Sequence, residues 1–389
     1  MSSVPTAPRL LLLAHGRLES VSPEGAVTSL DSHFATELLN RQERHHQVNA
    51  WKHDGQQGQS PFNRSSLWGA NGAPQPLAPT HFLSVVPGFH PGEFFYTLRV
   101  SAVAALLRLD GTDGRERRIL HQPDFREEGI CCDPASNRMV MAMGGADGSS
   151  YLALCNHEAT VRKDLTGGDS VDAHPSFSRQ SPDLVVYQSS GLARGPNGQV
   201  LASGPTSIQS IDLRSMEHQV LVDSPKFDHL LPYQAADGTL WFIRRPWKST
   251  LGASPWRSLV DLVLIPWKLA KAIFGFLDAF TQMFGKDRLH RAGGGDPQAG
   301  VHEMRGLFLG QAIAGRKEKG AKKTMRPPAD WVLVRRSPSG QEETIATQVG
   351  WFAPHGASVA WCDGQTIRTP EGEVLHKSKS GWIESFCLV

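Results

Sequence analysis

The sequence predicts an all-β fold built from a repeated hairpin unit, and three observations carry this prediction. In the clearest unit, the apolar anchor Tyr233 is followed seven positions later by Leu240, with the turn pair Asp237-Gly238 between them. The content of 38 Gly and 26 Pro in 389 residues suits many short strands and turns. The unit also recurs along the chain, in shortened form at Phe89 and in full at Cys132, Phe177 and Phe352.

The spacing of these anchors fits the blades of a β-propeller. The anchors at 89, 132, 177, 233 and 352 are separated by 43, 45, 56 and 119 residues. A propeller blade typically takes about 40–45 residues, and removal of residues 249–328 shortens the last interval to 39. We therefore expect six or seven blades with an insertion in the penultimate one. A β-sandwich with irregular hairpins is the alternative.

The unit resembles the TolB-type propeller repeat, a relative of the WD repeat, whose core reads roughly P-x-[FW]-S-P-D-G before an apolar strand. Residues 175–178 (PSFS) match its first half, and residues 236–238 (ADG) match its second half in the next blade. No copy carries the whole motif, and the WD dipeptide is absent. The resemblance covers most of residues 86–389 apart from the insertion, and it implies a propeller fold.

Some TolB-like enzymes place metal-binding histidines in the central channel, so the resemblance draws attention to the histidines near the anchors. These are His90, His174, His229 and His355. We favour packing and turn hydrogen bonds between blades as their role, because the sequence marks no further metal ligands. His45, His46 and His53 lie in a polar stretch without a completing ligand set, which favours a solvated loop.

The two ends of the chain share one layout. Residues 9–30 and 358–377 each contain an xG turn followed by a Pro-Glu-Gly turn, so both are expected to hold three strands of a blade. The unpaired apolar strand at 382–389 is expected to supply the inner strand of the first blade and to close the ring, which removes exposed sheet edges. Residues 31–85 lack clean alternation and are either a degenerate blade or a surface excursion.

The insertion changes from the period of a strand to that of an amphipathic helix. Residues 1–248 are expected to form the N-terminal blades, 249–328 an inserted helix plus a basic flexible loop, and 329–389 the last blades and the closing strand. The helix presents a narrow polar stripe and a wide apolar face. Its predicted contact residues for a membrane or a partner are Trp256, Trp267, Lys268, Lys271, Phe274, Phe276, Phe280, Phe284, Lys286 and Arg288.

Three interpretations of this helix remain open: packing onto its own blade, an interfacial position in a membrane surface through 254–291, or docking in a partner's groove. Charge favours an anionic membrane surface. Residues 244–326 contain 16 Lys and Arg against 6 Asp and Glu, a net charge of +10, so the rest of this +2 chain carries −8. The aromatic residues are not interleaved with the basic run, which argues against nucleic acid.

The sequence contains no catalytic, cofactor or metal signature. GxSxG, P-loop, GxGxxG and HExxH motifs are absent. Five cysteines without a disulfide-like framework, and an N-terminal apolar run too short for a signal peptide, predict a cytoplasmic protein, peripheral at the membrane if the helix docks there. We expect a non-enzymatic interaction scaffold with a protein partner, and the sequence gives no indication for or against a small-molecule ligand. The alternative is a lyase or hydrolase whose channel site uses scattered His, Asp and Glu.

Overall fold

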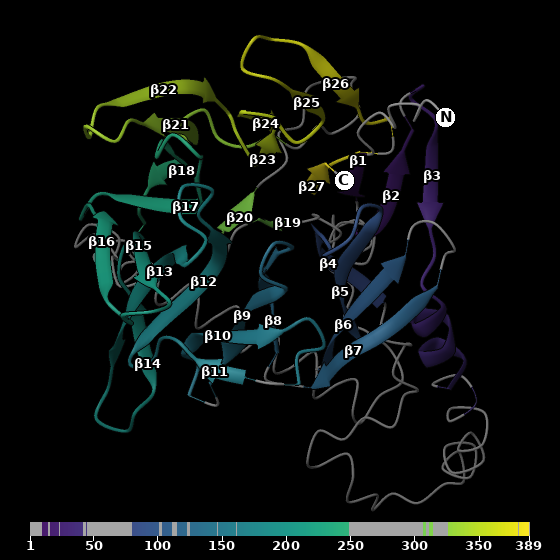
Figure 1. The fold of residues 1–389 in the computed structure, drawn as a ribbon, viewed down its shortest axis with the longest axis horizontal. Coiled ribbons are helices and arrows are strands. Elements are labelled where there is room, and N and C mark those ends of the chain that lie inside the picture. Colours follow the sequence, from purple (N-terminus) through teal and green to yellow (C-terminus); the bar gives the residue numbers. More distant parts are fainter. Residues whose placement is uncertain are drawn as a thin grey trace, which may run out of the picture.

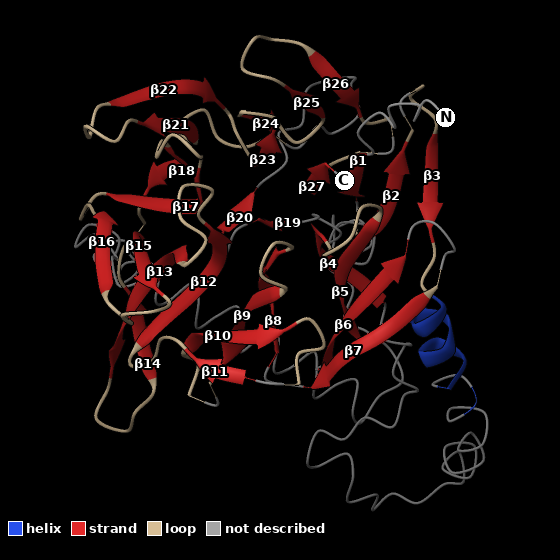
Figure 2. Ribbon diagram, viewed as in Figure 1, coloured by secondary structure: helices blue, strands red, loops and turns tan. Residues whose placement is uncertain are grey.

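The computed structural model describes residues 10–248 and 326–388, together with 306–308 and 311–313. Within these ranges it leaves out 15, 23, 42–43, 45–79, 101–102, 111–114, 123–124, 146, 161 and 380. The described secondary structure is β-strand apart from one helix that includes residues 33–41, drawn in blue in Figure 2. The all-β prediction is confirmed for this part of the chain.

Four sheets have four strands each, with sequential strands paired as antiparallel neighbours. The first is β27 (Ile383–Leu388), β1 (Leu10–Ala14), β2 (Arg17–Val21) and β3 (Val27–Leu30). The second is β4 (Thr80–Pro87), β5 (Glu93–Val100), β6 (Val103–Asp110) and β7 (Glu116–Gln122). The third is β17 (Phe227–Gln234), β18 (Leu240–Pro246), β21 (Val332–Arg336) and β22 (Glu342–Thr347). The fourth is β23 (Trp351–His355), β24 (Ser358–Cys362), β25 (Thr366–Arg368) and β26 (Val374–Lys377).

A larger sheet consists of two such meanders joined by the single parallel pair Ser150 and Val171. One meander is β8 (Phe125–Asp133), β9 (Arg138–Gly144), β10 (Ser150–Asn156) and β11 (Arg162–Asp164). The other is β12 (Ser170–Phe177), β13 (Leu184–Arg194), β15 (Ser207–Asp212) and β16 (His218–Val222), with β14 (Val200–Ser203) paired to the far end of β13. β19 (Gly306–Phe308) and β20 (Gln311–Ile313) form a separate two-stranded sheet.

The sheets are arranged around a common centre, as Figure 1 shows. Strands β4, β8, β12, β17, β23 and β27 are the innermost, and each contacts the next one around the centre. Hydrogen bonds show that neighbouring innermost strands run in the same direction. The Phe82 N–H near the start of β4 donates to Gly16 O beside the start of β27, and Arg179 N–H after β12 donates to Gln234 O at the end of β17. We call the face where these strands begin the entry face, and the opposite one the exit face.

Both ends of the chain contain the three strands that the sequence layout predicts, namely β1–β3 and β24–β26. β27 pairs antiparallel with β1, from Leu10 opposite Leu388 to Ala14 opposite Ile383. In the 31–85 stretch, the described residues form the helix at 33–41 and the start of β4 at Thr80. The pairing of β18 with β21 confirms that the chain returns from the insertion as the next strand of the same sheet.

The core lies in layers between neighbouring sheets, and the anchors belong to these layers. Phe89, Phe177, Tyr233 and Phe352 are buried, with exposed fractions of 7%, 8%, 9% and 5%, and the fifth anchor, Cys132, is partly buried. Each layer combines residues of two adjacent sheets. The seven-residue spacing therefore reflects one buried side chain per hairpin, followed by a turn. In the clearest copy, Gly238 closes the turn with a φ of 81°, and Ala235 N–H donates to Thr239 O over 2.9 Å.

Candidate functional site

A cavity of about 1410 Å³ lies between the innermost strands and receives residues from every one of them. It is larger than the roughly 300–1,000 Å³ of a typical small-molecule pocket. Its walls are more apolar than polar, and the acidic, basic and histidine lining residues are Asp133, His174, Arg179, Asp237, His355 and Glu384. The main apolar lining residues include Leu83, Ile130, Phe177, Leu231, Trp351 and Phe386. The cavity therefore offers both apolar walls and charged side chains to a ligand.

β-Bulges in several innermost strands present residues to this cavity. β12 is irregular between Ala173 and Ser176, and β17 is irregular at the corresponding place between Leu230 and Tyr233. In both bulges a residue precedes a proline: His174 with a φ of 47° and Leu231 with a φ of 54°. A left-handed conformation is uncommon for a non-glycine residue, and a bulge re-aims the side chains around it. Both residues line the cavity.

His174 contacts an aromatic partner two sheets away. Its ring centroid lies 6.0 Å from that of Trp351 on β23, with an interplanar angle of 71°. The indole Nε1–H of Trp351 donates to Phe386 O on β27 over 3.1 Å. Burial lowers the pKa of His174 to about 4, so the imidazole is neutral at pH 7. This row of contacts joins β12, β23 and β27 through one neutral imidazole.

The structure separates the four histidines near the anchors. His174 and His355 line the cavity. His229 is buried against Phe242, and its Nδ1 lies 3.3 Å from Thr206 O in the preceding meander, which is the expected packing between sheets. His90 is exposed and its N–H donates to Glu93. The part of the chain that the structure describes contains no group of three or more His, Cys, Asp or Glu that could hold a metal ion.

The cysteines of the channel are protonated thiols at neutral pH. All five cysteines of the chain are free. Cys131, Cys132 and Cys387 line the cavity, and burial raises the pKa of all three thiols, to about 12 for Cys131 and Cys387. Because the thiolate is the reactive form, none of these three thiols is activated as a nucleophile.

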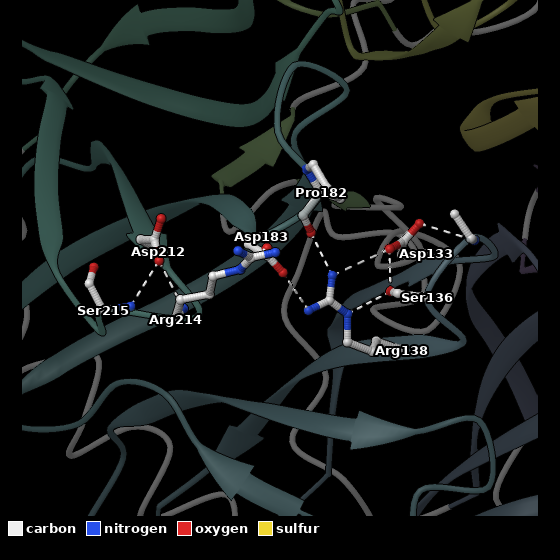
Figure 3. Close-up of polar contacts among 9 residues, drawn as sticks. Asp133, Ser136, Arg138, Pro182, Asp183, Asp212, Arg214 and Ser215 are labelled. Atoms are coloured by element: carbon white, nitrogen blue, oxygen red, sulfur yellow. Dashed lines mark hydrogen bonds and ion pairs between the residues drawn. The ribbon is translucent and has the colours of Figure 1, made fainter.

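An arginine clamp joins two meanders at the exit face, as Figure 3 shows. Arg138, the first residue of β9, donates to Asp183 over 2.9 Å and to Pro182 O over 2.7 Å. It also lies 3.6 Å from Asp133 in its own hairpin. The Arg138 guanidinium, followed by Arg214, lowers the pKa of Asp183. Because Arg138 and Asp183 are 45 residues apart, no local pattern could have predicted this clamp.

A buried ion pair lies at the entry face, where the chain leaves for the insertion. Arg245 Nε lies 3.0 Å from Asp228 Oδ2, and the two side chains are only 7% and 5% exposed. Asp228 also accepts the N–H of Thr206 over 3.0 Å. The guanidinium lies over the ring of Trp331, 4.8 Å from its centroid. Since Arg245 precedes the insertion and Trp331 follows it, this contact joins the two ends of that segment.

The largest departures from the repeat all leave the sheets at the entry face. β18 ends with Pro246 opposite Phe227, the first residue of β17, so the insertion starts there. Gly191 of β13 lies opposite Ser170, the first residue of β12, so the rest of β13 extends beyond that face. The long connection from β3 ends at the start of β4. At the exit face, the described connections from the innermost strands to their neighbours are short turns.

The predicted contact residues from Trp256 to Arg288 lie outside the described residues, so their contacts stay a prediction. Among the described residues, no helix is long and apolar enough to cross a membrane. Sequence reasoning missed the His174–Trp351 contact, the Arg138 clamp and the Arg245–Asp228 pair. The only local signals were the His174-Pro175 and Leu231-Pro232 steps, since a residue before proline is restricted in its backbone conformation.

No family model and no curated protein matches this sequence. A structure of a nidogen/laminin complex matches with a TM-score of 0.50 at 7% identity, covering 98% of each chain. TolB from Acinetobacter baumannii matches with a TM-score of 0.48 at 9% identity, covering 99% of this chain and 67% of that one. A putative TolB from Agrobacterium tumefaciens matches with a TM-score of 0.41 at 14% identity, covering 62% and 68%.

At such low sequence identities, the structural matches give information on the fold alone. The sheets around a central cavity and the full-length match to the nidogen/laminin structure agree with the predicted repeat. The fold is that of a β-propeller. The sequence prediction of this fold is confirmed, while the activity of this propeller has to be argued from its own residues.

Proposed function

We propose that this chain is a six-bladed propeller, closed by β27, that acts as a non-enzymatic interaction platform held at an anionic membrane surface by its insertion. The observation that carries the proposal is the asymmetry of the two faces. The insertion, the long β3–β4 connection and the extended β13–β14 hairpin all belong to the entry face. A surface that carries every large elaboration of a repeat fold is the natural place for binding.

The charge distribution supports a membrane as the docking surface. Residues 244–326 carry a net charge of +10, whereas the remaining chain carries −8. Each Lys or Arg close to an anionic lipid surface contributes about 1 kcal/mol. The acidic remainder would be repelled by the same surface, so the insertion determines the orientation. In the bound state the entry face lies against the membrane.

Co-sedimentation with liposomes tests this proposal. The intact chain is compared with a variant in which residues 254–326 are replaced by a Gly/Ser linker, using vesicles with anionic lipid and vesicles of neutral lipid only. We expect the intact chain to pellet with anionic vesicles at low salt and to be released as the salt concentration rises. The linker variant is expected to stay in the supernatant.

A second variant protects the test against misfolding of the deletion. Lys268→Glu with Lys271→Glu keeps the length of the chain and reverses two of the predicted contact charges. We expect it to lose binding to anionic vesicles while its thermal unfolding is unchanged. Equal pelleting of the intact chain and both variants would contradict the membrane proposal. If both variants pellet like the intact chain but no longer bind a protein that co-purifies with it, the insertion binds a protein partner.

A further inference from the structure

The β13–β14 hairpin is an extension of one sheet beyond the start of its innermost strand. β13 has 11 residues, and its last three pair with β14, as Leu192 with Ser203, Ala193 with Ala202 and Arg194 with Val200. The other strands of this meander do not reach so far. In Figure 1 the hairpin extends outward from the ring past β12. Residues 191–204 therefore form an arm at the entry face.

One arginine holds this arm against the neighbouring meander. Arg194 Nε donates to Asp169 over 2.6 Å, and its Nη2 donates to Asp147 over 2.6 Å. Its Nη1 donates to the backbone oxygens of Asp147 and Gly198. The Leu192 N–H adds a bond to Asp169 O over 2.8 Å. Since Asp147 and Asp169 lie in connections of the entry face, the arm lies along that face.

The arm exposes two adjacent large apolar side chains. Val200 is 43% exposed and Leu201 is 50% exposed. The other exposed large apolar residues of the described chain are single valines on outer strands: Val27, Val220 and Val374. Because Arg194 holds the arm in place, these side chains are presented at a small cost in conformational entropy.

We propose that Val200 and Leu201 form a second contact with the anionic lipid surface, beside the insertion. This inference rests on the proposed function. The arm and the start of the insertion belong to adjacent sheets and lie on the same face. A flat membrane surface that binds the insertion can therefore also contact the arm. The basic charge of residues 244–326 complements an anionic surface. The arm adds apolar side chains that enter the boundary between headgroups and acyl chains.

The test is the double variant Val200→Ser with Leu201→Ser in the full chain. Its binding is measured by co-sedimentation with phosphatidylcholine vesicles that contain about 30% phosphatidylserine, as a mimic of an anionic leaflet. Loss of two apolar side chains from the lipid boundary is expected to weaken binding about tenfold. The matched control is Val374→Ser, because Val374 is 50% exposed and is the first residue of β26, opposite Arg368 at the exit end of that sheet. This control is expected to bind like the intact chain.

A variant that is expected to bind more tightly adds a test that does not rely on a loss of binding. Leu201→Trp places an interfacial side chain on the arm and is expected to strengthen binding several-fold. If the linker variant of the insertion loses binding while both arm variants bind like the intact chain, the arm inference is wrong and the proposed function stands. If the serine pair instead dissociates a self-associated chain in sedimentation velocity without any lipid effect, the arm contacts a second copy and the lipid contact is wrong.

Discussion

The two faces of this propeller use their polar side chains differently. At the exit face, Arg138 connects turns of two meanders through Asp183 and Pro182 O, at the surface and next to short turns. At the entry face, Asp228 and Arg245 form a pair that is almost fully buried beneath the point where the insertion leaves. The Arg138 clamp of the exit face is therefore partly exposed, as is the Arg194 clamp of the entry face, whereas the Asp228–Arg245 pair of the entry face lies inside the structure.

The difference indicates where the fold can vary. A short turn held by a surface clamp leaves little room for added chain, whereas the entry face carries the insertion, the arm and the long β3–β4 connection. The buried pair keeps β17, β18 and the returning Trp331 together, whatever the insertion contacts. Binding can then take place at the entry face without loosening the sheets beneath it. The following substitutions test this contrast, from the largest expected effect to the smallest.

The largest effect is expected at the buried pair. Asp228→Ala leaves the Arg245 guanidinium buried without its carboxylate, and removal of one partner of a buried pair costs about 3–5 kcal/mol. Urea denaturation should show a lower midpoint with an unchanged slope. The double variant Asp228→Ala with Arg245→Leu should recover part of this loss, because no buried charge is left unpaired.

The control for this prediction is an exposed pair. Arg335 and Glu343 are 49% and 59% exposed, and Glu343→Ala should cost less than about 1 kcal/mol. If Asp228→Ala costs no more than this control, the buried pair does not stabilise the entry face. The contrast between the two faces would then be wrong.

An intermediate effect is expected from His174 inside the channel. Burial lowers its folded-state pKa to about 4, whereas an unfolded histidine titrates near 6.5. Between these values the unfolded chain binds the extra proton, so stability is complete above about pH 6.5 and falls as the pH falls toward 4. The full loss is about 3 kcal/mol.

The variant His174→Phe isolates this contribution. It keeps an aromatic ring beside Trp351 but cannot titrate, so its urea midpoint should fall less between pH 7 and pH 4 than that of the unmodified chain. Other histidines with lowered pKa values, such as His229 and His376, contribute equally to both proteins and cancel in the comparison. Parallel pH profiles would show that burial does not lower the pKa of His174, and this prediction would be wrong.

The fold was largely predictable because its signal is local. An apolar anchor, a turn and a strand occur within one hairpin, so the spacing from Phe177 to Leu184 or from Tyr233 to Leu240 is visible in the sequence. Both anchors are buried. The end strand at 382–389 was predictable because it had no neighbour in its own blade, and β27 does pair with β1.

The candidate sites were not predictable because their partners come from distant hairpins. His174 meets Trp351 only because sheets around the cavity bring β12 and β23 together. Arg194 meets Asp147 across 47 residues. A repeat specifies which residues are buried in each blade, while the contacts between blades depend on their packing angles. In the sequence, Val200 and Leu201 look like residues of an ordinary strand. Their exposure becomes apparent only once the extra length of β13 is known.

The smallest of these effects is expected at the exit face. Arg138→Ala removes hydrogen bonds to Asp183 and Pro182 O from a side chain that is 24% exposed, and it should cost about 1–2 kcal/mol. The pKa of Asp183 is lowered in the folded state, so this carboxylate stabilises the fold above its unfolded pKa and loses that effect as the pH falls through the folded pKa. Arg138→Ala should therefore reduce the acid sensitivity of urea unfolding, whereas Arg214→Ala, at an 82% exposed side chain, should reduce it less.

Binding to anionic vesicles should be unchanged in both variants, because the exit face faces away from the lipid. A loss of vesicle binding on Arg138→Ala would mean that the two faces are not independent.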